Sequence, residues 1–381
     1  MRLKYLLIAG LMFGAASAHA GETTYIFEGS MDSLYGYSDV SERFEKKDNN
    51  NHWLNNFYLN LGVEHEFNDT YKLGVYVDLM AGIDKEIDNF NNGSWGQEVY
   101  TTLDTPFGQL AAGETYNVAA QFHTGAPEVG ALGINNSDIV DFISNPNWTR
   151  KKHKTSFETL NSTAMNTDGV AAKINYITPE IYNTLLGITY VPDSYDRRGL
   201  INKYARYASD DAFIAALYNE TDLGFADMAV SAGYGVYHRD DKEFTVGMNL
   251  SRGGWTLGGS FRKTYVDGDD YTVTETSDNP RLPDLFDNYR EGKAWDIGLS
   301  YEIGPYEVSL SYFKSKADNT SNEDEIIMLS NKYQVDKNID IYLTAAHVDF
   351  EGNNNSVADN NQGYAFNNQG YAFVTGLSIS F

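Results

Sequence analysis

Apolar and polar residues alternate along much of the chain. In the stretch 56–64 the odd positions hold Phe, Leu, Leu and Val, whereas the even positions hold Asn, Tyr, Asn, Gly and Glu. A period of two predicts a β-strand with one apolar face and one polar face. The alternation resumes at Tyr71 after the turn-like pair Asn68 and Asp69. Two such segments joined by a short polar link predict a β-hairpin.

The same unit recurs to the end of the chain and predicts sixteen strands. Short links alternate with longer polar stretches, and the short links lie near Asn68, Pro106, Pro179, Thr221, Gly253, Pro305 and Asp336. An even strand number with short turns at one end and long loops at the other is typical of a bacterial outer-membrane barrel. A closed sheet also pairs every backbone group inside a bilayer. The pattern therefore predicts an all-β fold, a 16-stranded antiparallel transmembrane β-barrel over residues 21–381.

The first twenty residues follow a different pattern. Arg2 and Lys4 precede an apolar run over 5–16, and small residues flank His19 ahead of Gly21. These three parts are typical of a secretory signal peptide cleaved after residue 20. A transmembrane anchor is the alternative, but the run is shorter than the roughly 20 residues that a spanning helix needs. Together with the barrel, this segment predicts export to the cell outer membrane.

Composition narrows the possible classes of protein. The 381 residues carry a net charge of −25 and no cysteine, and 14% of them are aromatic. The excess of acid disfavours binding to nucleic acid, and the aromatic content disfavours disorder. The absence of cysteine excludes disulfides and thiolate metal sites. A barrel explains why so many aromatic residues coexist with a mean hydropathy of −0.44, since half of the strand positions face water.

Several short motifs carry a resemblance to a known family. The last strand ends on Leu377–Phe381, which resembles the C-terminal signature of outer-membrane barrel proteins, and a soluble β-sandwich explains this ending less well. Phe107–Glu114 looks like the turn and strand before the family's third loop, and Pro127–Gly130 is similar to an element within that loop. The hairpin over 176–193 also fits. In this order the motifs resemble the general bacterial porins, although Val129 replaces the family's aromatic residue.

This resemblance implies a homotrimer in which a long third loop folds into the lumen and narrows it. The corresponding stretch here, about 117–167, is far longer than the roughly 12 to 15 residues of an ordinary connection. Ser137 can cap a short helix over 138–144. The candidate constriction acids are Glu128, Asp138 and Asp141. The alternative is that some of them pin the loop to the wall or lie in a solvated cap.

The family opposes such acids with arginines on the barrel wall, and this sequence departs from that pattern. On the polar face of the early strands lie Tyr58, Asp78 and Glu98, which we predict to line the lumen. Lys173 and Arg262 are the later inward-facing cations and are predicted at the constriction. A wall with few cations predicts a preference for cations. The basic run 150–154 (Arg150 to Lys154) has three possible roles: pairing with the acids, solvated charge, or contact with lipopolysaccharide phosphate.

No constellation of catalytic residues is present, so the sequence predicts no enzyme. His347 and Asp349 share a strand face, but no serine motif accompanies them. The acidic stretches 267–270 and 319–324 lack the spacing of an EF-hand. The sequence therefore predicts neither a metal site nor a cofactor.

Two channel functions compete. The first is passive diffusion of small hydrophilic solutes and ions; the alternative is a substrate-specific channel, for example for oligosaccharides, with lumen tyrosines as a stacking track. Structural anchoring by acidic loops with a plugged lumen is a third possibility. The expected partners are solutes, outer-membrane lipid and lipopolysaccharide.

A seven-residue repeat near the end sets the register of the last strand. Residues 360–366 recur unchanged as 367–373, and an odd repeat length inverts strand parity. We expect the second copy in the strand, with Tyr371 and Phe373 facing outward.

Overall fold

The computed structural model describes residues 21–40, 51–82, 96–135, 138–151, 154–157, 159–193, 210–237, 241–265, 291–318, 320–352 and 367–381. The strands are β1 (Glu22–Val40), β2 (Asn51–Asn68), β3 (Tyr71–Gly82), β4 (Gly96–Thr105), β5 (Gly108–Glu114), β6 (Trp148–Lys151), β7 (Lys154–Phe157), β8 (Ala172–Ile177), β9 (Thr184–Asp193), β10 (Asp210–Asp222), β11 (Asp227–Val236), β12 (Lys242–Arg252), β13 (Trp255–Tyr265), β14 (Gly292–Ile303), β15 (Tyr306–Ala317), β16 (Glu323–Asp336), β17 (Ile339–Glu351) and β18 (Asn367–Ser380). The short helices are α3 (Val118–Gln121) and the 3₁₀ helix η2 (Asp138–Asp141).

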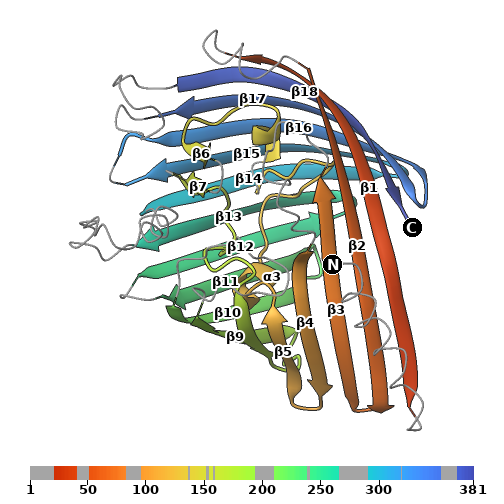
Figure 1. Ribbon diagram of the computed structural model, residues 1–381. Helices are drawn as coiled ribbons and strands as arrows, with labels where there is room; N and C mark the ends of the chain where they lie inside the picture. The colour runs from red at the N-terminus through yellow and green to blue at the C-terminus, as the bar shows by residue number, and fades with distance from the viewer. Residues whose placement is uncertain are drawn as a thin grey trace, which may run out of the picture.

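Sixteen of these strands form one closed antiparallel barrel, and β6 and β7 form a separate hairpin (Figure 1). Each strand pairs with its neighbours in sequence, and β1 closes the barrel against β18, with Ser30 opposite Ser380. The turns at one end are short, for example 69–70 and 253–254. The predicted strand number and the positions of the short turns are therefore confirmed.

The two faces of each strand differ as the alternation predicts. In β14, Ala294 and Asp296 face inward and are buried, whereas Trp295 and Ile297 face outward and are 37% and 49% exposed. Outward aromatic residues pair near both ends of the strands. Trp255 and Tyr301 at the turn end have ring centroids 4.4 Å apart, and similar pairs occur at the loop end. Such girdles are typical of the two membrane interfaces.

The segment between β5 and β8 lies inside the barrel and supplies an apolar core there. One cluster joins its residues Leu132, Ile139 and Phe142 to inward-facing residues of β1, β2 and β14–β18. A second cluster joins Val118 and Met165 to inward-facing residues of β8–β10 and to Tyr237 just after β11. The lumen is thus partly filled by a packed loop, which includes α3, η2 and the β6–β7 hairpin (Figure 1).

Local structure differs from one expectation and agrees with another. The helix predicted over 138–144 is only the four-residue 3₁₀ helix η2, because Ile139, Phe142 and Ile143 turn into the apolar cluster. The second copy of the repeat lies in β18, and Tyr371 and Phe373 face outward with 54% and 55% exposure, which confirms that prediction.

Several other expectations fall outside the described residues. These are the signal segment 1–20, Ser137, Lys152, His153, the acidic stretch 267–270 and the first copy of the repeat at 360–366. Within the described ranges, no helix is long and apolar enough to cross a membrane.

Candidate functional site

The outgoing leg of the inner loop, residues 115–135, follows the inner wall from β9 to β15. Asn117 caps α3, since its side-chain oxygen accepts a hydrogen bond from the Ala120 amide at 2.8 Å. Four further bonds then tie the leg to successive strands. They are Val118 N to Thr189 Oγ1 (3.0 Å), Thr124 N to Ser231 Oγ (3.0 Å), Ala126 N to Asp296 Oδ1 (2.6 Å) and Ser311 Oγ to Pro127 O (3.3 Å).

Small inward-facing residues on β9 and β12 allow this close approach. A Cβ atom at Gly247 would overlap the carbonyl oxygen of Thr124, and one at Gly187 would lie 2.7 Å from the Cβ of Val118. Any larger side chain at either position would therefore displace the loop. Gly247 therefore leaves room for the loop backbone at Thr124, and Gly187 leaves room for the side chain of Val118.

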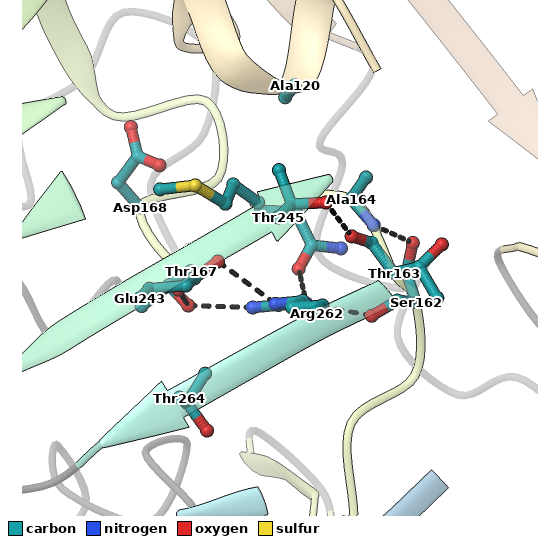
Figure 2. Close-up of polar contacts among 12 residues, drawn as sticks. Ala120, Ser162, Thr163, Ala164, Thr167, Asp168, Glu243, Thr245, Arg262 and Thr264 are labelled. Carbon is teal, nitrogen blue, oxygen red and sulfur yellow. Dashed lines mark hydrogen bonds and ion pairs between the residues drawn. The ribbon is translucent and has the colours of Figure 1, made fainter. Parts of the chain in front are cut away.

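The return leg, residues 159–171, is held by a buried ion pair on the wall (Figure 2). The Nε of Arg262 on β13 lies 2.9 Å from Glu243 on β12. The same guanidinium donates to the Ser162 carbonyl at 3.1 Å, to Asn166 at 2.8 Å and to Thr167 at 2.8 Å. Arg262 therefore bonds three loop residues and one wall residue, with its side chain almost fully buried.

Lys173 makes a second clamp where the loop joins β8. Its ammonium lies 2.7 Å from Asp168, and both side chains are fully buried. It also donates to the carbonyls of Thr115 at 2.5 Å and Gly169 at 2.6 Å, so it joins the start of the loop to its end. Sequence parity places Lys173 and Arg262 on the inner face correctly. Both, however, lie beneath the loop and do not line the open passage, because the loop covers them.

A polar network joins both legs to the wall between these clamps. The Thr163 hydroxyl donates to Asp296 at 2.6 Å, and Ser260 donates to the same carboxylate. Thr163 also lies 3.2 Å from the imidazole of His123 on the outgoing leg. Burial lowers the pKa of His123, so the neutral imidazole is favoured at this position.

The three candidate acids of the loop lie close enough together to influence one another. The amide of Asn135 donates to Glu128 at 2.8 Å, and the amide of Gly133 donates to Asp138 at 2.9 Å. Burial raises the pKa of Asp138 to about 7, and the charges of Asp141 and Glu128 contribute in the same direction. The structure thus brings together the residues that the sequence proposed as constriction acids.

The β2–β4 wall beside the loop is acidic and aromatic. Asp78 lies directly across from Glu98 in the β3–β4 register, and Asn60 donates to Asp78 from β2. Glu98 accepts a bond from Thr115 at 2.6 Å, so it also holds the start of the loop. Tyr58 on β2 lies within electrostatic range of Asp32, Asp138 and Asp141, which places the last two, both on the loop, near this wall.

Inward-facing charges fall into two groups. The basic residues at inward positions of the described strands all sit in ion pairs: Lys72 with Glu64 (3.2 Å), Lys173 with Asp168 (2.7 Å), Arg262 with Glu243 (2.9 Å) and Lys332 with Glu307 (2.5 Å). In contrast, several inward or loop acids have no ion pair among the described residues: Asp32, Asp78, Glu98, Glu128 and Asp138. On the described part of the barrel wall and the inner loop, where the basic side chains of the β6–β7 hairpin are not included, the charge left without an ion pair is therefore negative.

An open cavity of about 850 Å³ lies beside the outgoing leg. Tyr116, Gln121 and Glu128 line it from the loop, and Tyr218 and Asn249 line it from the wall. The lining also includes small and aliphatic residues such as Ala120 and Leu185, so polar and apolar side chains both line the cavity. Among the described residues, no group of three His, Asp or Glu side chains could hold a metal ion.

Sequence reasoning missed the acids that pair with the inward-facing cations. Glu243 has the inward parity of β12, between Lys242 and Phe244, so the alternation could have revealed it. Asp168, and the amide Asn166 that also bonds Arg262, lie in the irregular end of the loop, where apolar and polar residues do not alternate. The path of the loop alone brings them to the wall.

A closed sixteen-stranded barrel with aromatic girdles, a lipid-facing apolar surface and a loop packed inside defines an outer-membrane barrel channel. Residues 7–353 match the family model of the Gram-negative porins, and the chain belongs to this family. It is accordingly an outer-membrane porin, a channel and not an enzyme. No curated protein matches the chain.

Solved porin structures share the fold at low identity. The chain is similar to OmpF of Salmonella typhi, solved with daunomycin (14% identity, 94% of this chain and 97% of that one, TM-score 0.60). It is similar to an anion-selective porin from Comamonas acidovorans (15%, 94% and 100%, 0.58). It is also similar to the trimer form of OmpT from Vibrio cholerae (11%, 94% and 99%, 0.58). These likenesses show the fold.

Proposed function

We propose that this porin is a water-filled channel for passive diffusion of small hydrophilic solutes and ions, with a preference for cations. The observation that carries the proposal is the charge of the passage. Glu128, Asp138 and Asp141 on the loop lie close together, and Asp138 and Asp141 are near Tyr58 on the wall that also carries Asp78. The inward-facing cations of the described barrel strands are already paired. Acids on the loop and on the wall attract cations and repel anions in a narrow passage.

Under this proposal Lys173 and Arg262 act as positioning residues. Their charges are neutralised by Asp168 and Glu243, so their contribution is to hold the loop at a fixed distance from the wall. The width of the passage then depends on these two clamps. Residues 1–20 are proposed as the signal peptide that directs export.

Assembly as a homotrimer is part of the proposal. It is supported by the family and by the neighbour from Vibrio cholerae, which was solved as a trimer. Cross-linking of the purified protein followed by denaturing electrophoresis tests it. A ladder that stops at three subunits supports the trimer, and a single unlinked band contradicts it.

A substrate-specific channel is the second candidate, and the tyrosines of the wall favour it. Tyr76 and Tyr100 stack with centroids 5.0 Å apart, and the Tyr76 hydroxyl donates to Glu64 at 2.5 Å. Because these rings stack on each other, one face of each is already covered. This arrangement fits a rigid wall better than an open stacking track for sugars.

Single-channel recording in a planar bilayer distinguishes the two. Passive diffusion predicts an ohmic conductance that a panel of mono- and oligosaccharides leaves unchanged at millimolar concentration. Block of the current by one sugar, saturating with concentration, would favour the substrate-specific channel. The variant Tyr76→Ala should then relieve the block, whereas Tyr306→Ala on the outer face should leave it intact.

A further inference from the structure

The β6–β7 hairpin of the inner loop is closed at its base by one buried carboxylate, that of Asp324 on β16. Asn147, directly before β6, donates from Nδ2 to Asp324 Oδ1 at 2.7 Å. Thr159, two residues after β7, donates from its hydroxyl to Asp324 Oδ2. All three residues are buried. Both ends of the hairpin segment are therefore held at one point of the barrel wall.

Two further bonds fix the base of the hairpin to β17 and β18. Asn147 Nδ2 also donates to the carbonyl of Glu351, the last residue of β17, at 2.9 Å. Asn368 on β18 donates to the carbonyl of Ser144 at 2.7 Å, three residues before Asn147. Because β16 begins at Glu323 and β17 ends at Glu351, these contacts lie at the loop end of the barrel. In Figure 1 the hairpin lies inside the barrel towards this end.

The hairpin brings basic residues to the loop end of the lumen. Its two strands carry Arg150, Lys151 and Lys154 and no acidic residue. The long loops of outer-membrane barrels face the exterior, so this end is the outer mouth of the channel. The anchor at Asp324 thus places a basic element where solutes enter from outside.

The acidic segment of the loop meets the same strand deeper in the barrel. A Cβ atom at Gly130, two residues after Glu128, would lie 3.4 Å from the Cβ of Ser330 on β16. Asp324 lies six residues nearer the loop end of β16, which is about 20 Å along the strand. Since the Debye length is about 10 Å at 0.1 M salt, the basic mouth and the acidic passage act as separate zones at this concentration.

We propose that Asp324 is a positioning residue of the channel: by anchoring the β6–β7 hairpin it holds positive charge at the outer mouth, in series with the acidic passage. This proposal rests on the acidic passage proposed above. Fixed charges concentrate mobile ions of the opposite sign. A voltage that is positive at the turn end draws anions in through the basic mouth and cations in through the acidic passage, so both accumulate between the zones. The opposite voltage depletes both, and the channel therefore conducts better in one direction.

Single-channel currents of the full, refolded protein at equal and opposite voltages test the proposal. The larger current divided by the smaller gives the asymmetry, whichever way a channel inserts. We expect an asymmetry for the wild type in about 0.1 M potassium chloride and its disappearance in about 1 M, where the Debye length is only about 3 Å. Asp324→Leu, which removes both acceptors of the anchor, should make the two currents equal at the lower concentration.

Two charge variants separate the hairpin from the rest of the loop end. Arg150→Gln/Lys151→Gln/Lys154→Gln leaves the anchor intact and should also make the two currents equal, so it decides the outcome even if Asp324→Leu does not fold. The matched control is Lys263→Gln/Lys293→Gln/Lys316→Gln, which removes three positive charges from the outward face at the same end of the barrel and should keep the asymmetry.

Asp324→Asn distinguishes positioning from charge. Asparagine keeps an oxygen that accepts from Asn147 and offers its amide to the hydroxyl of Thr159, so the asymmetry should be retained. Equal losses in Asp324→Asn and Asp324→Leu would assign the effect to the charge of Asp324 itself and would overturn the proposal.

The remaining outcomes separate this proposal from the proposed function. Equal currents in the wild type, or an asymmetry that either Asp324→Leu or the hairpin variant leaves unchanged, would overturn the role of Asp324. The reversal potential of the same channels tests the acidic passage. Cation preference combined with equal currents contradicts only the role of Asp324, whereas chloride preference contradicts the proposed function.

Discussion

At the scale of single residues, Asp138 links the charge of the passage to pH. Burial raises its pKa to about 7, and the neighbouring Asp141 and Glu128 contribute to the same shift. This carboxyl is therefore only partly ionised at neutral pH. The negative charge that the loop presents to the passage grows as the pH rises through this value.

We expect the preference for cations to increase between pH 5.5 and pH 8.5. One added charge at 5 Å in water attracts a cation by about 0.8 kcal/mol and repels an anion by the same amount, so the permeability ratio of potassium to chloride should rise up to roughly sixteenfold. Asp138→Asn should flatten this dependence, whereas Asp349→Asn on the outer face should preserve it. Reversal potentials across the pH series provide the measurement, and an equally steep dependence in Asp138→Asn would contradict the assignment.

The same pKa has a consequence for stability. Because the carboxyl in the folded protein has a pKa of about 7, above its ordinary 3.8, the folded state holds the proton more tightly than the unfolded chain. The contribution of Asp138 to stability is therefore present at low pH and is lost as the pH rises from about 3.8 to 7. Urea-unfolding curves at pH 4 and pH 8 measure this loss of unfolding free energy in the wild type. In Asp138→Asn the contribution of this residue to the difference between the two pH values should be absent.

Gly247 tests the close fit between loop and wall. In Gly247→Ala the new methyl group would overlap the Thr124 carbonyl, so the outgoing leg must move into the passage or away from its seat. We expect an altered single-channel conductance and a loss of about 1–3 kcal/mol in unfolding free energy. Val246→Ala, which changes a lipid-facing residue of the same strand, is the control. Wild-type conductance in Gly247→Ala would show that the loop does not rest on this glycine.

Residue parity could be predicted from the sequence, and burial could not. Alternation alone is enough to place Lys173 and Arg262 on the inner face. Whether such a residue faces water or lies under the loop depends on the path of the loop, and that path is set by contacts between residues about a hundred positions apart, such as Arg262 and Ser162. No local pattern carries that information.

At the scale of elements, the loop between β5 and β8 depends on its buried ion pairs. Arg262→Met should leave Glu243 buried without its partner, at a cost of about 3–5 kcal/mol in unfolding free energy. The double variant Arg262→Met/Glu243→Leu should lose less, because no unpaired charge remains. Lys72→Met, which breaks a partly exposed pair, should cost less than about 1 kcal/mol.

Urea unfolding of the wild type, these three variants and Glu243→Leu alone in detergent measures these differences. If the double variant unfolds more easily than Arg262→Met by the same free energy that Glu243→Leu alone takes from the wild type, the two residues are not coupled. Arg262→Met should also change the single-channel conductance, since the return leg is then free to move. Normal conductance with reduced stability would assign Arg262 to the fold alone.

The elements themselves were predictable to different degrees. Strands and turns follow from a period of two and from turn residues such as Gly253, which has a φ of +57°. The β6–β7 hairpin was not predicted, because the basic run that begins at Arg150 lacks apolar alternation. The helix expected after Ser137 ends early because its apolar residues pack against β1 and β18 instead of continuing a helical face.

At the scale of the whole molecule, the fold does not decide which ions pass. A neighbour with the same barrel at 15% identity is an anion-selective porin, whereas the inner loop of this chain carries the three neighbouring acids Glu128, Asp138 and Asp141. Ion preference must therefore come from the side chains that the barrel and loop position. The excess of acidic residues in the composition affects ion preference only where the barrel and loop position such residues along the passage.

The reversal potential of single channels in a tenfold potassium chloride gradient distinguishes a preference for cations from a preference for chloride. We predict a potential with the sign of cation preference, reduced in a triple variant Glu128→Gln/Asp138→Asn/Asp141→Asn and unchanged in the surface variant Asp349→Asn. A potential with the sign of chloride preference in the wild-type protein, or one that the triple variant leaves unchanged, would contradict the account.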